Sequence, residues 1–198
     1  MGERMKYLTL LGDSVLDNSS YTGKGESSFD WLRNFAPKGW EVLLGARDGG
    51  VVSSIPFQMH QIHPLTSSIL LSIGGNDAVR EKWRLYAFKG RTLWRSLRIA
   101  AADFGLRYRE MLDQNFTPLF SKLTICTIYG GDFGEDQNII NTAVGLFNRE
   151  ILSLAGKRGI RVLDLYHLLQ GEEFFTSFIE PSSLGSAILA HNFWKGLD

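Results

Sequence analysis

Two short runs of small and polar residues, each directly after an apolar stretch, contain side chains that could carry out nucleophilic catalysis. Residues 8–14 read Leu-Thr-Leu-Leu-Gly-Asp-Ser, and residues 69–77 read Ile-Leu-Leu-Ser-Ile-Gly-Gly-Asn-Asp. A serine hydroxyl can attack a carbonyl carbon, and a neutral asparagine amide can donate to the oxyanion that forms. Ser14 and Asn76 are therefore candidates for a nucleophile and an oxyanion donor.

Short apolar runs rich in Leu, Ile and Val alternate with segments compatible with helices, which predicts an α/β fold built on a doubly wound parallel sheet. The predicted strands are residues 7–11, 40–44, 68–73, 122–128 and 161–165. The predicted helices are residues 28–35, 53–61, 93–116, 137–157 and 183–194, and Gly159 marks the end of the fourth. In that fourth helix, the predicted inward stripe is Ile139, Ala143, Phe147, Ile151 and Leu154.

The strand ends should bring the two candidate runs together, because ligands of an open parallel sheet bind at its carboxyl edge. Each residue also has a purely structural interpretation. Ser14 could cap a following helix, and Asn76 could stabilise a turn. We expect Asp13 and Asp77 to brace the two loops through hydrogen bonds to the backbone.

Composition excludes several classes of protein. The 198 residues carry a formal net charge of zero, which argues against a nucleic-acid partner. The single cysteine, Cys126, excludes an internal disulfide and is expected to be a buried core thiol.

No G-x-G-x-x-G or P-loop motif, which would indicate a nucleotide-binding protein, follows a strand. With no apolar stretch long enough to span a membrane and no signal-peptide pattern, we expect a cytoplasmic protein. The oligomeric state cannot be read from the sequence.

The order and spacing of three features resemble the SGNH (GDSL-type) hydrolases: Gly-Asp-Ser at residues 12–14, a glycine after the second strand, and Gly-Gly-Asn-Asp at residues 74–77. This resemblance implies a single domain over residues 1–198, folded as a flavodoxin-like three-layer α/β/α sandwich with a five-stranded parallel sheet. It also implies an esterase, lipase or thioesterase that acts on a small ester or acyl substrate through an acyl-enzyme, without metal or cofactor.

The resemblance further implies that Ser14 is the nucleophile. The oxyanion hole would consist of the backbone N–H groups of Ser14 and Gly49 and the side-chain amide of Asn76. Alignment with the family's second glycine selects Gly49, and Gly45 and Gly50 are alternatives in the same turn.

The family's Asp-x-x-His block is altered in this chain. Glu180 occupies the histidine position and Ser177 the aspartate position, although the following Pro-Ser and glycine are present. Three hypotheses follow. Glu180 is the general base, with a pKa raised by its apolar loop; or His167, just after the last strand, replaces it; or the chain is an inactive binding module for a small acyl or carbohydrate ligand.

The segment from residue 77 to residue 92 is expected to be irregular. It is rich in basic and aromatic side chains and follows the candidate asparagine. It is either a lid that contacts substrate or a solvated connection anchored by its aromatic residues.

Overall fold

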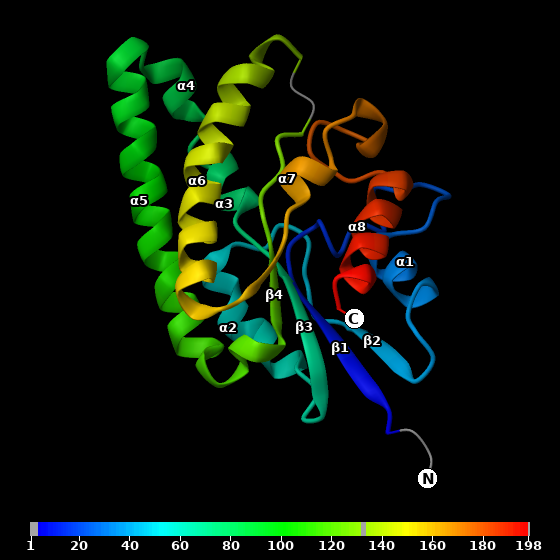
Figure 1. Cartoon of the computed structure of the whole chain (residues 1–198). Helices are drawn as coiled ribbons and strands as arrows, with labels where there is room; N and C mark the ends of the chain where they lie inside the picture. Colours follow the sequence, from blue (N-terminus) through cyan, green and yellow to red (C-terminus); the bar gives the residue numbers. More distant parts are fainter. Residues whose placement is uncertain (1–3, 132–133, 198) are drawn as a thin grey trace.

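The computed structural model describes residues 4–131 and 134–197, which form one five-stranded parallel sheet with helices on both faces (Figure 1). The strands are β1 (Lys6–Gly12), β2 (Trp40–Leu44), β3 (Thr66–Ser72), β4 (Leu123–Cys126) and β5 (Arg161–Leu163). Their order in the sheet is β2-β1-β3-β4-β5, with Leu8 paired to Val42 on one side and to Ser68 on the other. This is the flavodoxin-like order, whose direction of winding reverses between β1 and β3.

Eight α-helices and several short 3-10 segments connect the strands within the described residues. The α-helices are α1 (Ser28–Asn34), α2 (Ile55–Gln58), α3 (Gly75–Val79), α4 (Trp83–Ala87), α5 (Gly90–Asn115), α6 (Gln137–Arg158), α7 (Leu165–Leu168) and α8 (Ser183–Lys195). Figure 1 shows α1 and α8 on one face of the sheet and α5 and α6 on the other.

The strand side chains alternate between two buried cores, as a covered parallel sheet requires. Leu8, Leu10 and Leu70 pack with α1 and α8, whereas Ile69 and Leu71 pack with α5 and α6. The apolar character of both faces explains why the strands are continuous apolar runs. The predicted three-layer α/β/α fold is confirmed.

Local signals fix several helix ends. The Ser27 hydroxyl accepts a hydrogen bond from the Asp30 N–H, and the Asp30 carboxylate accepts one from the Ser27 N–H, so α1 begins with a capping box. Gly159 ends α6 with a φ of 63°, as predicted. The first predicted stripe residue of α6, Ile139, is exposed, while Phe147 is buried. Figure 1 shows the start of α6 extending beyond the sheet, where no strand can cover it.

Two predicted segments differ from the structure. The helix expected at residues 53–61 is divided into a 3-10 turn, the four-residue α2 and a second 3-10 turn. Pro56 lies in the first turn of α2, and the Gln58 side chain is drawn inward to bond the backbone of Gly12. The segment after Asn76 was expected to be irregular but contains α3 and α4, which are too short to produce a readable hydrophobic period.

Cys126 is buried, as predicted. No helix within the described part of the chain combines the length and the apolar character needed to cross a membrane.

Candidate active site

The end of β1 is shaped so that the chain must turn immediately before Ser14. Gly12 has a φ of 134°, and a Cβ there would overlap the carbonyl oxygen of Ser72 on β3. The Gln58 side chain accepts from the Gly12 N–H at 2.7 Å and donates to the Gly12 carbonyl at 2.8 Å. Nothing in the sequence pattern pointed to Gln58, since a lone glutamine in a short helix has no distinctive spacing.

Ser14 and Glu180 are in direct contact. The Ser14 hydroxyl donates a hydrogen bond to Oε1 of Glu180 at 3.1 Å. Both residues are buried, with 7% and 8% of their surfaces exposed. No helix begins after Ser14, so its hydroxyl is not a helix cap. A hydroxyl bonded to a carboxylate in a buried site is the arrangement of a nucleophile and its base.

The loop that carries Glu180 is held on several sides. The Tyr129 hydroxyl donates to the carbonyl of Ile179 at 2.6 Å, and the Thr176 N–H donates to the Glu180 carbonyl at 2.9 Å. The Asn18 side chain donates to the carbonyl of Pro181 at 3.1 Å. These bonds fix the backbone on both sides of the carboxylate, and neither Tyr129 nor Asn18 was singled out from the sequence.

Burial raises the pKa of the Glu180 carboxyl above its ordinary value. The hydrogen bond from Ser14 lowers this pKa, and the negative charge of Asp48 raises it. The second carboxylate oxygen, Oε2, is buried and has no hydrogen-bond partner among the described residues. Among the described residues, no third side chain therefore orients the Glu180 carboxylate, whereas in a triad a third residue orients the base.

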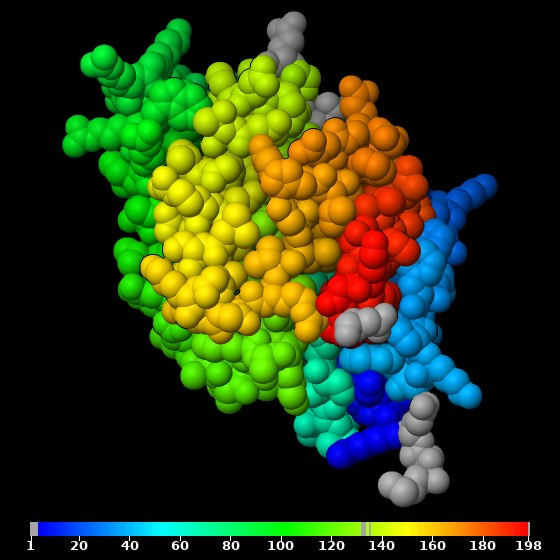
Figure 2. All heavy atoms as spheres, in the orientation of Figure 1, coloured from blue at the N-terminus to red at the C-terminus, as the bar shows by residue number. Residues whose placement is uncertain are grey.

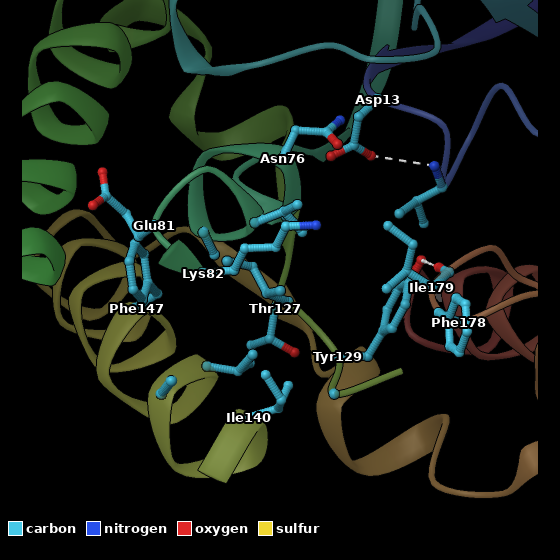
Figure 3. Close-up of a pocket in the computed structure, with 18 of the residues that line it drawn as sticks. Asp13, Asn76, Glu81, Lys82, Thr127, Tyr129, Ile140, Phe147, Phe178 and Ile179 are labelled. Atoms are coloured by element: carbon cyan, nitrogen blue, oxygen red, sulfur yellow. Dashed lines mark hydrogen bonds between the residues drawn. The ribbon is translucent and has the colours of Figure 1, made fainter. Parts of the chain in front are cut away.

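Two further buried carboxyls, those of Asp13 and Asp77, lie in the loops after β1 and β3, and both accept hydrogen bonds from the backbone, as predicted. Oδ1 of Asp13 accepts from the Val15 N–H at 3.2 Å (Figure 3), and Oδ2 of Asp77 accepts from the Val52 N–H at 3.0 Å. Burial raises the pKa of Asp13 to about 8, while the bond from Val15 lowers it and the charge of Glu180 raises it. Burial therefore favours the neutral form of the Asp13 carboxyl.

Burial also raises the pKa of Asp77, but other interactions oppose this rise. The hydrogen bond from Val52 and the nearby Arg107 guanidinium, 3.9 Å from the carboxylate, both lower it. Asp77 thus connects the loop after β3 to the turn after β2.

The Asn76 side chain also bridges two loops. Its amide donates to the carbonyl of Gly50 at 2.9 Å, which leaves the second N–H of the amide for another acceptor. The N–H groups of Gly45 and Gly50 are bonded to the carbonyls of Leu10 and Arg47.

Gly49 has a φ of 73°, and its N–H makes no hydrogen bond within the described part of the chain; the same is true of the Ser14 N–H. Among the glycines of this turn, Gly49 therefore has the uncommitted donor. Gly49 is exposed and does not line the cavity described below.

Among the described residues, no hydrogen bond joins His167 to Ser14. Its side chain lies on α7, is 71% exposed, and has Nδ1 2.7 Å from Oδ2 of Asp164. Asp164 also accepts from the Thr127 hydroxyl at 2.8 Å. The pair has the Asp-x-x-His spacing in the sequence, and this spacing is the signal by which it could have been found.

An apolar cavity of about 430 Å³ opens beside Ser14, and Figure 3 shows Asp13 and Asn76 at one end of it. Its wall is largely apolar and includes Ile73, Leu97, Ile128, Val144, Phe147 and Ile179. The segment around α4 contributes Lys82 and Tyr86, and Figure 3 shows the Lys82 side chain extending into the cavity. Cavities of this size and polarity accommodate small organic ligands. Glu180 is not among the lining residues.

The described residues contain no cluster of three or more His, Cys, Asp or Glu side chains arranged to hold a metal ion. The groups that the described residues bring to this edge of the sheet include the Ser14 hydroxyl, the Glu180 carboxylate and the Asn76 amide.

No protein-family model and no curated protein matches the sequence. Solved structures do match the fold. A lipase from a goat rumen metagenome superposes with a TM-score of 0.74 at 20% identity, over 96% of this chain and 97% of that chain. An acetylxylan esterase from Geobacillus stearothermophilus gives a TM-score of 0.71 at 16% identity, over 98% and 95%. A member of the lipolytic G-D-S-L family from Veillonella parvula gives 0.66 at 16% identity, over 96% and 97%.

These proteins carry hydrolase names and share the arrangement of strands and helices with this chain almost from end to end. At identities of 16–20% the likeness concerns the fold. The chain therefore has the fold of the SGNH (GDSL-type) hydrolases.

Proposed function

We propose that the protein is a serine ester hydrolase in which Ser14 is the nucleophile and Glu180 the general base. The observation that carries the proposal is the 3.1 Å hydrogen bond between these two buried side chains beside an apolar cavity. The lipase and esterase names of the structural neighbours support the same class of reaction.

In the first step, Oε1 of Glu180 takes the proton of the Ser14 hydroxyl while the hydroxyl oxygen attacks the ester carbonyl carbon. An ordinary glutamate is too acidic to be an effective base near neutral pH. Burial raises the pKa of Glu180, which increases the affinity of its carboxylate for this proton. The 3.1 Å hydrogen bond from the Ser14 hydroxyl to Oε1 of Glu180 supports a direct transfer.

The developing oxyanion would accept hydrogen bonds from the N–H groups of Ser14 and Gly49 and from the Asn76 amide. The two backbone donors are uncommitted among the described residues, and the bond to Gly50 orients the amide. One donor of this kind is worth about 2.7–4 kcal/mol in the transition state. Asn76→Ala should therefore lower kcat by about 100- to 1000-fold.

When the tetrahedral intermediate collapses, the carbon–oxygen bond to the alcohol breaks and Glu180 returns the proton to the leaving oxygen. The acyl group stays on Ser14. A water molecule then attacks the acyl carbon, Glu180 takes its proton and passes it back to Ser14, and the acid is released. The apolar cavity would hold the acyl chain during both halves of the reaction.

One observation favours an alternative, in which the fold is a binding module for a small acyl or carbohydrate ligand. Oε2 of Glu180 has no partner within the described part of the chain, so nothing orients the base as a carboxylate orients a catalytic histidine. A fluorophosphonate probe, which labels activated serines, separates the two functions.

The test compares wild type, Ser14→Ala and Glu180→Gln for probe labelling and for hydrolysis of p-nitrophenyl esters. Glu173→Gln is a matched control, because Glu173 is exposed in the same loop. Wild type and the control should be labelled and active, Ser14→Ala should be neither, and Glu180→Gln should lose about 100- to 10,000-fold in kcat. An unlabelled and inactive wild type would support the binding module, and an active Glu180→Gln would exclude Glu180 as the base.

A further inference from the structure

One surface of this electrically neutral protein is strongly positive. Residues 80–102, which include α4 and the first half of α5, carry seven cationic side chains and one acidic side chain, Glu81. Glu81 is paired with Arg84. The other cations are exposed, and no salt bridge to them is found among residues 4–131 and 134–197. They are Arg80, Lys82, Lys89, Arg91, Arg95 and Arg98.

Exposed apolar groups are interspersed with these charges. Tyr86 is 78% exposed and Trp83 49% exposed, both on α4, and Ile99 is exposed on α5. Arg91, Arg95 and Arg98 are spaced to share one face of α5, where they form a shallow groove with Trp94, Ile99 and Ala102. Figure 2 shows long side chains of this green segment projecting from the body of the molecule. We call the exposed side chains of residues 80–102 the basic-aromatic surface.

The basic-aromatic surface is continuous with the wall of the cavity beside Ser14. Lys82, Leu85 and Tyr86 belong to the same short segment and line that cavity. Figure 1 places α4 and the first turns of α5 beyond the carboxyl edge of the sheet, on the side of the candidate site. A ligand that covered this surface would therefore lie next to the cavity opening.

We propose that the basic-aromatic surface docks the protein on an anionic lipid–water interface. Clusters of lysine and arginine are attracted to anionic headgroups, and exposed Trp and Tyr side chains occupy the headgroup region, where one end of the ring system is apolar and the other is hydrated. Six unpaired cations beside two exposed aromatic rings combine both features. Charge complementarity selects an anionic surface, and the exposed rings favour a lipid surface over a nucleic-acid backbone.

The docking goes beyond the proposed function and does not depend on it. If the protein hydrolyses esters, docking would present an acyl chain from the interface directly to the cavity. The binding experiment therefore uses Ser14→Ala protein, so that hydrolysis has no part in the result.

The test is vesicle co-sedimentation with Ser14→Ala protein. The vesicles are pure phosphatidylcholine, or phosphatidylcholine containing one third phosphatidylserine. The test variant adds Arg91→Glu, Arg95→Glu and Arg98→Glu, and the matched control adds Lys24→Glu, Lys38→Glu and Arg161→Glu, which are exposed cations outside this surface. Circular dichroism verifies that both variants fold.

We expect binding to the anionic vesicles only, lost at about 1 M salt, where the Debye length falls to about 3 Å. Neutralising one basic residue near an anionic membrane lowers partitioning by about fivefold, so the three substitutions together should reduce it by at least 100-fold. The control variant should bind nearly as well as the parent. Trp83→Ala with Tyr86→Ala should weaken binding even though it removes no charge.

Three results would overturn the proposal. The first is equal partitioning of the parent protein to neutral and anionic vesicles. The second is equal partitioning of the test and control variants. The third is tight binding of the parent to duplex RNA or DNA with no binding to anionic vesicles, which would assign the surface to a nucleic acid. In the otherwise wild-type enzyme, the three arginine substitutions should leave hydrolysis of a soluble short-chain ester unchanged, which separates docking from catalysis.

Discussion

The Tyr129 hydroxyl donates a 2.6 Å hydrogen bond to the carbonyl of Ile179, the residue directly before Glu180. Tyr129 follows β4, so this bond fastens the loop that carries the carboxylate to the sheet. The position of the carboxylate relative to Ser14 therefore depends on a residue that does not itself contact the serine hydroxyl.

Tyr129→Phe should lower kcat by about tenfold with little change in KM, because small displacements of a base are costly while the cavity keeps its shape. Steady-state kinetics measure both constants. Tyr108→Phe is the matched control, since the buried Tyr108 hydroxyl has no hydrogen-bond partner among the described residues and its removal should not destabilise the protein. A kcat of Tyr129→Phe equal to that of wild type would show that the bond does not position Glu180.

The pH dependence of activity should report a carboxylate base. Burial raises the pKa of Glu180, and only its ionised form accepts the Ser14 proton, so activity should rise with pH through this raised value and then level off. The double substitution Ser177→Asp and Glu180→His restores the family's Asp-x-x-His block. In this variant the rise of activity with pH should be centred near about pH 6.5, the ordinary pKa of histidine. Profiles of kcat/KM against pH measure the pH at which activity rises in wild type and in the double variant. If activity rises at the same pH in both proteins, Glu180 is not the base.

Asp13 should make the folded state less stable as the pH rises. The pKa of its carboxyl is raised from an ordinary value of 3.8 to about 8 in the folded protein, because burial disfavours the charged form. The folded state therefore binds the proton more tightly than the unfolded chain. Proton binding by Asp13 makes its full contribution to the free energy of unfolding below pH 3.8, and this contribution declines as the pH rises toward 8. By pH 7 the decline amounts to about 4 kcal/mol.

Asp13→Asn should remove this dependence, because its side chain stays neutral and its oxygen can still accept from the Val15 N–H. Urea unfolding at several pH values should show that the free energy of unfolding of the variant increases relative to that of wild type between pH 4 and pH 7. The exposed Asp103→Asn is the control and should parallel wild type. A constant difference between Asp13→Asn and wild type would mean that Asp13 is ionised in the folded state.

The cavity should set the preference for acyl chain length. Ala143 lines it from α6, so Ala143→Phe should fill part of the space. We expect hydrolysis of acetyl esters to be nearly unchanged and hydrolysis of long-chain esters to fall by about tenfold or more, because overpacking excludes the longer chain. Leu152→Phe, on the exposed side of the same helix, is the control. An unchanged chain-length profile would place the acyl chain elsewhere.

The sheet was predictable because its strands are buried on both faces and read as continuous apolar runs. Residues 40–44 form a strand with the predicted bounds, and α5 and α6 are long enough to show a clear period. By contrast, α3 and α4 have five residues each, and the helix expected after β2 is divided near Gln58, whose side chain bonds the backbone of Gly12 46 positions away. Short helices and single side-chain bonds leave no periodic signal.

The candidate site was predictable where the motif lay on a strand end. Ser14 and Glu180 were identified as a possible pair from the family pattern, and the structure brings them into contact. The residues that hold them, such as Tyr129, could not be foreseen, because they bond backbone atoms of loops whose paths the sequence does not reveal. The relation of Asp164 to His167 was visible in the spacing alone.

The contact between Ser14 and Glu180 spans 166 positions of the chain and joins the first loop of the sheet to the turn before α8. A partly folded chain that has assembled β1 and β3 but not this last turn would lack the hydrogen bond from Ser14 to Glu180. Under the proposed mechanism, recovery of hydrolysis during refolding should therefore lag behind recovery of the core between the sheet and helices α5 and α6.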